Sequence, residues 1–429
     1  MARRLTRLLV VTRHNPFPEN DGAGAYLFDI VEYVAKHDFT VEVAWLHADG
    51  AIKSKGRWRI PEKFRRTAQL QIIGGKTIGR TIYFAGEYWY GRKARILNTI
   101  KVTLKKLGLS YLLASREARK NSASSTSQLH NQGILTKANW SAPPSPAETA
   151  FFKKRLHAFR PDAVLLNYCW LAPLLDGLAD LPTAILTNDV VSQRLERTPG
   201  LAIDPATPEG EASLLARARH TLAISQDDAE IFRAMLPSQS IINTPKAAAP
   251  RSLLGAPVPQ RVLFVGGIND FNLEGILWFL VNAWPLVHAK NNQAVLHICG
   301  GIGSALPEVP AGVVVRGRVL DLAVEYTEAS AVIVPLLHGT GVKIKLVEAA
   351  SYGKAIITTP VGLQGLGFLR PAVVEAEQST LFAEGVLRVL CNPDLQKSLG
   401  QTVLHMVTTH LSADSAYGPA LQALSGSNS

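Results

Sequence analysis

Short apolar runs that alternate with segments of helical spacing are the feature of this 429-residue chain that most limits its fold. The runs "LTRLLVVT" at 5–12 and "TVEVAWL" at 40–46 are typical of buried strands. Between them, a turn-rich loop leads into a helix expected over 26–36. Its apolar residues at helical spacing are Leu27, Ile30, Val31 and Val34. Strand–helix–strand units of this kind build parallel sheets, which bind ligands at the carboxyl ends of their strands.

The same alternation returns in two later blocks. The further apolar runs lie at 159–169, 183–189 and 220–225, and then at 261–267, 294–301, 312–319, 330–337 and 355–359. Residues 243–260, between the blocks, are rich in Pro and Ala without periodicity, as is typical of a linker. We therefore predict an α/β protein with two doubly wound, Rossmann-like domains that face each other across a cleft.

The predicted boundaries follow from these blocks. The first domain spans 1–245 and carries a basic insertion at about 51–150, and the second spans 261–410. Residues 246–260 connect them. The C-terminal tail, 411–429, either packs back onto a domain or is disordered.

Composition excludes several classes of protein. A hydrophobic content of 47% and a charged content of 18% are those of a globular protein. The three cysteines are widely spaced, which favours a reducing compartment over a disulfide or zinc framework. The apolar run after the N-terminal arginines, about five residues long, is too short for a signal sequence, and no run of 18 apolar residues occurs. We expect a cytoplasmic protein.

One segment makes the chain basic. Residues 51–120 contain 18 Lys or Arg against three acidic residues, whereas the whole chain has a net charge of only +11. The aromatic run "YFAGEYWY" and an amphipathic helix expected over 96–114 favour contact with an anionic membrane surface or a lipid-diphosphate acceptor. A solvated insertion is the alternative. No RNA- or DNA-binding module accompanies the charge, so nucleic acid is not an expected partner.

The stretch "GTGVKIKLVEAASYG", 339–353, has two lysines in an unusual place. A glycine-rich loop leads into a helix that we expect to begin near Val342. The first turn of a helix favours acidic residues, because the helix dipole already places positive charge there. Lys343 and Lys345 therefore require an explanation.

Two explanations are open. In one, an anion is bound by both lysines and by backbone N–H groups that Gly339 and Gly341 leave accessible. This requires Lys343 to lie on the loop side of the helix cap, since the two lysines otherwise point to different faces. In the other, Lys345 forms a solvated pair with Glu348, worth about 0.2–0.5 kcal/mol.

The longer stretch "GTGVKIKLVEAASYGKAIITTPVGLQGL" closely resembles the nucleotide-sugar-binding segment of retaining glycosyltransferases of family 4, which have the GT-B fold. Members commonly carry two Glu residues separated by seven others. In a sub-pattern, a glycine-rich loop and two basic residues replace the first Glu. This chain is similar to the sub-pattern, with Thr340 at the first Glu position and Glu348 at the second. Further similar segments lie at 12–35, 161–168, 186–194, 263–280 and 316–336, whereas 55–145 is not covered.

The resemblance implies a role for each residue of the motif. Glu348 would bind the nucleotide ribose, and Lys343 and Lys345 the diphosphate. The other implied donor-site residues are Gly22 and Gly24 beside the transferred sugar or phosphate, Gly266 and Gly267 beside the diphosphate, Arg318 and Val319 at the base, and Gly339, Thr340, Gly341 and Val342 in the loop before the helix. Retention in this family is attributed to front-face attack, so no dedicated nucleophile is implied.

Two positions depart from the family pattern. Thr340 replaces a Glu, as the sub-pattern allows. Asn188, in "TND", occupies a position where we would expect His. Asn188 can hydrogen-bond a sugar but cannot carry a proton at neutral pH. Its neighbours Asp189 and Arg194 fit a structural role better.

Other motifs carry less information. The loops "FVGGIND" and "CGGIGSA" follow strands, but neither has the dinucleotide-binding pattern G-x-G-x-x-G. The histidines His14, His47, His157, His220, His297 and His338 lack the spacing of metal ligands. We therefore expect no metal and no cofactor. His338, beside the glycine loop, is a candidate for contact with a sugar hydroxyl.

The sequence thus predicts a metal-independent, retaining glycosyltransferase that moves a sugar, of the hexosyl type, from a nucleotide-sugar donor to a glycan or lipid-linked acceptor. The expected setting is polysaccharide or glycoconjugate assembly in the cytoplasm, peripheral at the inner membrane face if the basic segment binds lipid. The alternative is a non-catalytic subunit of the same fold that binds a glycan or a nucleotide.

Overall fold

The described part of the chain falls into two compact units, Met1–Thr183 and Ala184–Ser429. The computed structural model describes residues 7–17, 22–46, 57–84, 141–193, 206–339 and 341–426. The helix expected over 96–114 and most of the predicted insertion lie outside these residues, as do Thr340 and Arg194.

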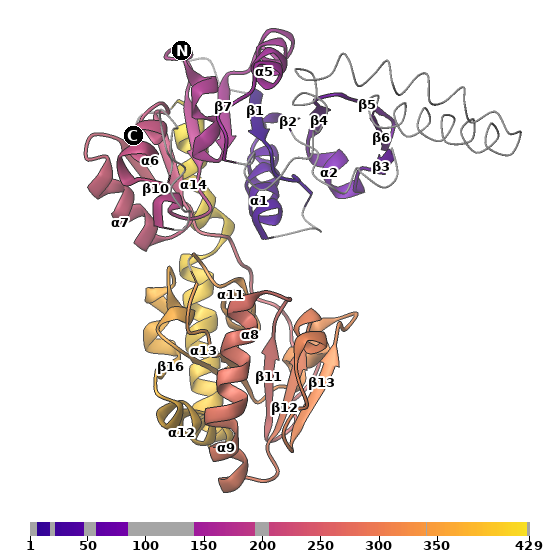
Figure 1. The fold of residues 1–429 in the computed structure, drawn as a ribbon, viewed down its shortest axis with the longest axis vertical. Coiled ribbons are helices and arrows are strands. Elements are labelled where there is room, and N and C mark those ends of the chain that lie inside the picture. The colour runs from indigo at the N-terminus through magenta and orange to yellow at the C-terminus, as the bar shows by residue number, and fades with distance from the viewer. Residues whose placement is uncertain are drawn as a thin grey trace, which may run out of the picture. The chain divides into compact units, whose positions relative to one another are not determined.

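The N-terminal sheet has seven strands in the order β10-β9-β8-β7-β1-β2-β4 (Figure 1). Its strands are β1 (Arg7–Thr12), β2 (Thr40–Trp45), β4 (Gln69–Ile72), β7 (Ala163–Asn167), β8 (Thr183–Leu186), β9 (His220–Ala223) and β10 (Ser240–Asn243). β1 pairs in parallel with both β2 and β7. The apolar runs that predicted strands are confirmed here, because parallel strands that helices cover on both faces need nearly continuous apolar sequence.

The helices of this region are α1 (Gly22–Lys36), α2 (Glu62–Thr67), α5 (Pro146–Phe159), α6 (Pro208–Leu215) and α7 (Gln226–Met235). The prediction that the first helix begins at Tyr26 was wrong, since α1 begins four residues earlier, at Gly22. The apolar periodicity starts only at Tyr26, and the small residues before it give no pattern to read. Ser145 caps α5 with a capping box, in which its side chain and that of Glu148 each bond the other's backbone N–H.

A small antiparallel sheet inside the basic segment was not predicted. It consists of β3 (Arg57–Arg59), β5 (Gly75–Ile78) and β6 (Thr81–Phe84), in the order β3-β6-β5. Glu62 lies 3.0–3.2 Å from Arg65, Arg66 and Arg80, so one carboxylate serves three of the local arginines. Part of the basic charge is therefore paired within this unit.

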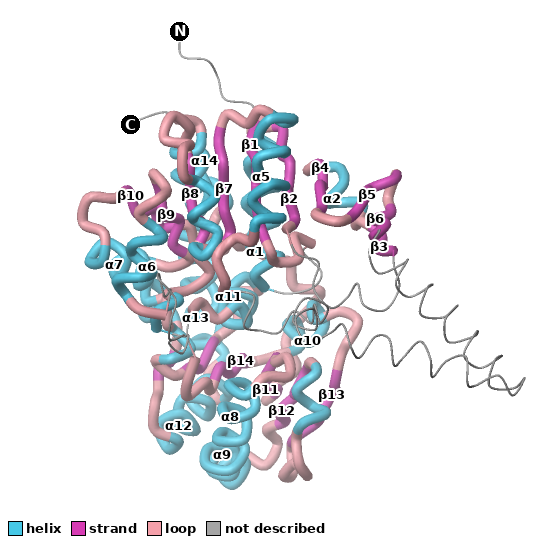
Figure 2. The backbone as a smooth tube through the Cα atoms, turned by 45° about the horizontal axis from the view of Figure 1, so that its top comes forward, coloured by secondary structure: helices cyan, strands magenta, loops and turns pink. Residues whose placement is uncertain are grey.

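The C-terminal sheet has six strands in the order β13-β12-β11-β14-β15-β16 (Figure 2). They are β11 (Arg261–Val265), β12 (Val295–Cys299), β13 (Val313–Gly317), β14 (Ala331–Val334), β15 (Ile356–Thr358) and β16 (Val374–Glu375), and all their pairings are parallel. The helices are α8 (Asp270–Trp278), α9 (Trp284–Lys290), α10 (Leu322–Glu328), α11 (Ile344–Ser351), α12 (Ser379–Leu390), α13 (Pro393–His410) and α14 (Ala413–Leu424).

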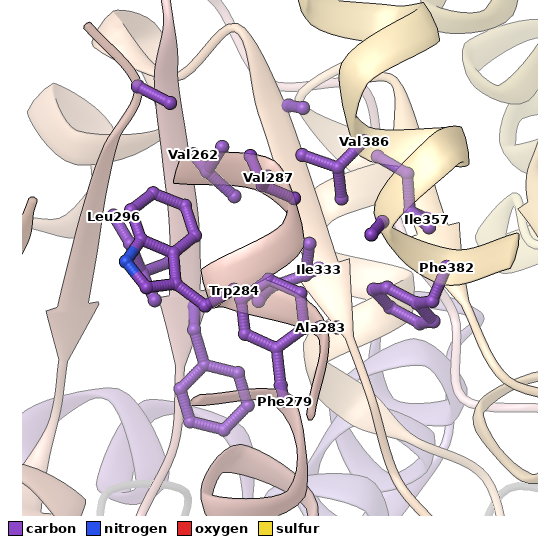
Figure 3. Close-up of a cluster of buried hydrophobic side chains, with 14 of the residues drawn as sticks. Val262, Phe279, Ala283, Trp284, Val287, Leu296, Ile333, Ile357, Phe382 and Val386 are labelled. Carbon is purple, nitrogen blue, oxygen red and sulfur yellow. The ribbon is translucent and has the colours of Figure 1, made fainter. Parts of the chain in front are cut away.

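Two apolar cores, one on each face of this sheet, show that it is doubly wound. On one face, Val262 and Phe264 of β11 pack with residues of α8, α9 and α12, including Trp284 and Phe382 (Figure 3). On the other face, Leu263 packs with α10, α11 and α13. The alternation along β11 therefore places neighbouring side chains in different cores.

Between β10 and β11 the chain forms neither helix nor strand, in the segment predicted as the linker. The C-terminal tail forms α14, and the hydroxyl of its buried Tyr417 accepts a hydrogen bond from the backbone N–H of Ala247 at 2.8 Å. The tail is thus tied to the start of this connecting segment.

Candidate anion-binding site

The first turn of α11 has the features that the sequence associated with an anion site. The helix begins at Ile344, with Lys343 as its N-cap, two residues later than the sequence suggested. Within this fully described helix, no side chain caps the N-terminus and no acidic residue lies in the first turn. Because the first N–H groups of a helix lack intrahelical partners, they favour an anionic ligand. Lys343 is the N-cap itself and has extended rather than helical backbone, so the angle between the two lysines is not the one that a continuous helix would give.

The loop before α11 depends on glycine. Gly339 has φ +125° and Gly341 has φ +70°, both in the region that side chains disfavour. A Cβ atom on Gly339 would also lie 3.6 Å from the ring of Phe271 and 3.7 Å from Lys343 Nζ. The glycines therefore let the backbone turn tightly beside the lysine. Val342 follows them and packs at the edge of the core beneath α11.

Both lysines are substantially buried. Lys343 Nζ donates to the carbonyl oxygen of Gly341 at 2.7 Å and to Gln364 Oε1 at 3.3 Å. Lys345 Nζ donates to Asn272 Oδ1 and lies 4.9 Å from the ring centre of Phe264.

Their surroundings depress the pKa of each ammonium group. Burial lowers the pKa of Lys343 to about 8. Burial, with a smaller contribution from the charge of Lys343, lowers the pKa of Lys345 to about 8 as well. The charge of Asp228 partly opposes the effect of burial at Lys343. Two ammonium groups near each other favour an anionic ligand.

The lysines open onto a cavity of about 200 Å³. Its lining residues are Asn269, Phe271, Asn272, Leu336, His338, Gly339, Lys343, Ile344 and Lys345. A second cavity, of about 590 Å³, shares His338 and Gly339 with the first and is also lined by Gln364 and Arg370. The small cavity suits a phosphate group, and the larger one has the size of a site for a small molecule.

Glu348 lies one turn further along α11 and has partners other than Lys345 among the described residues. Its Oε1 accepts a hydrogen bond from Arg251 Nη1 at 3.1 Å, and its Oε2 accepts one from the Tyr326 hydroxyl at 3.3 Å. The ring of Tyr326 stacks on that of Tyr352, over which Arg251 also lies. The structure thus does not contain the solvated Lys345–Glu348 pair that was one of the two explanations.

Two glycine loops at the carboxyl ends of β11 and β12 press against each other. A Cβ atom on Gly300 would lie 2.2 Å from the carbonyl oxygen of Gly266, so only glycine fits there. The carbonyl oxygen of Gly267 accepts a hydrogen bond from Asn272 Nδ2 at 2.9 Å. Through Asn272, the loop of Gly266 and Gly267 is joined to Lys345.

Arg318 and Val319 follow β13 at the same edge of the sheet. The Arg318 side chain is exposed, and its Nε lies 3.6 Å from the position of a Cβ atom on Gly301. Val319 packs against the core beneath α10 and α11. Both residues therefore directly follow the carboxyl end of β13.

The remaining predicted site residues lie outside the C-terminal sheet and its helices. Asn188 follows β8, and its carbonyl oxygen lies 3.6 Å from where a Cβ atom on Gly341 would be. Gly22 and Gly24 lie in the first turn of α1, in the unit Met1–Thr183. Thr340 lies outside the described residues.

Sequence analysis missed three groups that shape the site. Asn272 and Arg251 hold the side chains of Lys345 and Glu348, although they lie 73 and 97 residues away from them in the chain. Asp228, at the start of α7, is buried, and this raises its pKa to about 6. Asn269, the N-cap of α8, could have been predicted from the sequence, because Asn directly before a helix is a favoured cap.

No group of three or more His, Cys, Asp or Glu in the described part of the chain is placed to hold a metal ion. Among the helices that the structure describes, none is long and apolar enough to cross a membrane.

A family match covers much of the C-terminal sheet and its helices. Residues 259–392 match the family described as glycosyl transferases group 1. This segment of the chain is similar to group 1 glycosyltransferases. The segment contains the two lysines, Glu348 and both glycine loops. It confirms the glycosyltransferase resemblance of the sequence.

A curated relative matches over a shorter length. An uncharacterized 44.6 kDa protein in the cps region of Klebsiella pneumoniae is 28% identical over 140 residues. The match covers 30% of this chain and 36% of the relative, so it spans about a third of that protein.

Several solved structures match this chain over nearly its whole length. Sucrose-phosphate synthase from Thermosynechococcus elongatus matches with a TM-score of 0.61 at 14% identity, covering 97% of this chain and 98% of that one. Anabaena Alr3699/HepE in complex with UDP matches with a TM-score of 0.63 at 12% identity, covering 98% and 100%. A mutant of S. aureus TarM in complex with fondaparinux, α-GlcNAc-glycerol and UDP gives 0.63 at 8% identity, covering 98% and 100%. The predicted GT-B-like fold of two Rossmann-like domains is confirmed.

Proposed function

We propose that this chain is a retaining glycosyltransferase that moves a sugar from a nucleotide-sugar donor to a glycan or lipid-linked acceptor. The observation that carries the proposal is the pair of lysines, the buried Lys343 and the partly buried Lys345, at the N-terminus of α11, which no side chain caps, in the segment that matches the group 1 family. Positive charge at a helix N-terminus is unfavourable unless an anion compensates for it, because the helix dipole is already positive there. A diphosphate supplies that compensation.

The chemistry explains why the site needs fixed positive charge. The acceptor hydroxyl oxygen bonds to the anomeric carbon of the donor sugar while the bond from that carbon to the phosphate oxygen breaks. The bonding electron pair moves onto the leaving nucleoside diphosphate, and the hydroxyl proton passes to the departing phosphate. Lys343, Lys345 and the N–H groups of α11 stabilise the negative charge that develops on the phosphate, and losing one such donor typically costs about 2.7–4 kcal/mol of barrier.

Each of the other residues is assigned to one part of the donor. Glu348 binds the ribose hydroxyls, and the backbone at Arg318 and Val319 receives the base. Gly266 and Gly267 allow the diphosphate to approach the first loop of the domain. The larger cavity beside His338 receives the transferred sugar, with Asn188 and Thr340 contributing to its binding. No residue is assigned as a nucleophile, and no metal or cofactor is assigned to the site.

The relatives support this setting. Two of the solved structures with the same fold contain UDP, and one of these also contains a GlcNAc-glycerol ligand. Another, WaaG, is a glycosyltransferase involved in lipopolysaccharide biosynthesis, and the Klebsiella relative is encoded in a cps region. Polysaccharide or glycoconjugate assembly is therefore the process that we propose.

The basic segment 51–120 is proposed to contact anionic lipid. Flotation with liposomes that contain anionic lipid, at low and high salt, tests this. Binding at low salt that is lost at high salt supports the proposal, and indifference to anionic lipid would make the segment a solvated insertion.

The experiment for the donor site is thermal unfolding in the presence of UDP-, GDP- and ADP-sugars. At a hundredfold excess over Kd, a donor that binds only the folded chain adds about 2.7 kcal/mol to its stability. Absence of any shift would refute the nucleotide site. A shift that persists in both Lys345→Ala and Glu348→Ala would refute the residue assignment.

A second candidate function, a non-catalytic nucleotide- or glycan-binding subunit, is favoured by one observation. Asn188 occupies the position where the family resemblance predicts His, and an amide cannot transfer a proton. Release of nucleoside diphosphate from a bound donor distinguishes the two. Turnover supports the enzyme, and binding without turnover in the presence of glycan acceptors supports the subunit.

A further inference from the structure

Asn272 joins two parts of the anion site that are far apart in the sequence. It lies in the first turn of α8 and is only 6% exposed. Its Oδ1 accepts a hydrogen bond from Lys345 Nζ, and its Nδ2 donates to the carbonyl oxygen of Gly267 at 2.9 Å. Its backbone N–H donates to Asn269 Oδ1 at 2.8 Å, which fixes the start of the helix.

These partners leave the amide only one orientation. The carbonyl of Gly267 can only accept and the ammonium of Lys345 can only donate, so the Asn272 side chain must face them with its nitrogen and oxygen respectively. Both the backbone and the side chain of Asn272 are thus fixed. The side chain also lines the cavity of about 200 Å³ onto which Lys345 opens.

We propose that Asn272 is the positioning residue for Lys345, holding its ammonium group at the cavity with a neutral oxygen acceptor. The inference rests on the proposed function, since it takes the ligand of Lys345 to be the diphosphate of a nucleotide. The neutrality of the amide matters as much as its geometry. A carboxylate in this buried position would pair with Lys345 and use the charge that the ligand requires.

The test is a double-mutant cycle that uses calorimetric titration of the nucleoside diphosphate selected from UDP, GDP and ADP. Asn272→Leu should weaken binding by about tenfold or more, because a hydrogen bond to a charged group is lost. In a Lys345→Met background, the same substitution should have little further effect, because the group that it positions is absent. Asn272→Asp should weaken binding at least as much as Asn272→Leu.

Two controls keep the result interpretable. Asn282 lies in the helical turn Phe279–Ala283 that directly follows α8, and it is exposed. Asn282→Leu and Asn282→Asp make the same chemical changes away from the cavity, so both should leave the Kd unchanged. Asn272→Gln keeps both amide groups and should recover part of the affinity that Asn272→Leu loses. If Asn272→Leu does not fold, Asn272→Gln and Asn272→Asp, compared with and without Lys345→Met, complete the cycle.

The outcomes separate this inference from the function on which it rests. If the wild-type chain binds no nucleoside diphosphate, the proposed function fails. If the wild-type chain binds and Lys345→Met weakens binding, but Asn272→Leu has the same effect with or without Lys345, the positioning role fails and the function stands.

Discussion

Arg251 Nη1 lies 3.1 Å from Glu348 Oε1, which joins the segment between the two sheets to the helix of the anion site. The backbone N–H of Arg251 also donates to the carbonyl oxygen of Ser351 at 2.8 Å, at the end of the same helix. The guanidinium lies 5.2 Å from the ring centre of Tyr352. Arg251 is therefore held at three points on α11 and orients the carboxylate that we assign to the ribose.

Replacing Arg251 should weaken nucleotide binding through Glu348. We expect Arg251→Ala to raise the Kd for the nucleoside diphosphate by about three- to tenfold, because half-exposed ion pairs contribute modestly. A 2′,3′-dideoxy analogue should bind both proteins equally, since it lacks the hydroxyls that Glu348 contacts. Calorimetry with both ligands is the measurement, with Arg388→Ala, an exposed position on α12, as control. An equal loss for both ligands would contradict the assignment.

Gly339 should not tolerate a side chain. At φ +125°, an L-residue is strained, and we expect Gly339→Ala to reduce the free energy of unfolding by about 1–3 kcal/mol. Gly367→Ala is the matched control. The φ angle of Gly367 is not positive, and a Cβ atom there would meet open space. Urea unfolding compares the variants. If Gly339→Ala is as stable as Gly367→Ala, the loop does not depend on glycine in the way described.

Nucleotide binding should weaken above about pH 8. Burial places the pKa of Lys343 and of Lys345 at about 8, and a bound diphosphate favours their charged forms. Affinity should therefore be insensitive to these groups well below pH 8 and should fall as the pH rises through their pKa. At pH 8, binding should take up about one proton, because each lysine is about half protonated.

Titration in buffers of different ionisation enthalpy measures that uptake. Lys345→Met should reduce the uptake by about half, since one of the two titrating groups is gone. Uptake that is absent in the wild-type protein would show that neither lysine changes protonation on binding.

The buried ion pair of Arg13 and Glu148 should be important for stability. Arg13 Nε lies 2.8 Å from Glu148 Oε1, and its Nη1 donates to the carbonyl oxygen of Ala142 at 2.6 Å. Arg13→Ala leaves a buried carboxylate without its cation, and we expect a loss of about 3–5 kcal/mol in the free energy of unfolding. Urea unfolding followed by circular dichroism measures it.

The control for that substitution is Arg370→Ala. Arg370 pairs with Glu375 at 2.7 Å, but its side chain is 61% exposed, so its loss should cost less than about 1 kcal/mol. The double replacement of Arg13 by Met and Glu148 by Leu should recover part of the stability, because it removes both buried charges. Equal effects of Arg13→Ala and Arg370→Ala would show that burial does not strengthen the first pair.

The strands and the general location of the site could be predicted from sequence for a physical reason. Strands buried on both faces require continuous apolar runs, and such runs at β1, β7, β11 and β14 are hard to mistake. The helix ends were harder to predict. α1 begins with small residues before its apolar pattern, and the N-cap position of α11 is Lys343, which is not a usual cap residue.

The partners of the site residues could not be read from the chain. Lys345 and Glu348 are separated by three positions on one helix, and their spacing alone favours a pair. In the folded chain Lys345 faces Asn272 on α8, whereas Glu348 faces Arg251 and Tyr326. Only the packing of α8, α10 and the connecting segment around α11 decides this, and no local pattern encodes it.

The central claim is that Lys343 and Lys345 form the diphosphate site of a nucleotide-sugar donor. The most direct measurement is calorimetric titration of UDP, GDP and ADP into the wild-type chain and into Lys343→Met and Lys345→Met. We predict that at least one nucleotide binds the wild-type chain with one site per chain, and that each substitution weakens it by about tenfold to a hundredfold. Binding that is unchanged in both variants, or no binding of any nucleotide to the wild-type chain, would contradict the claim.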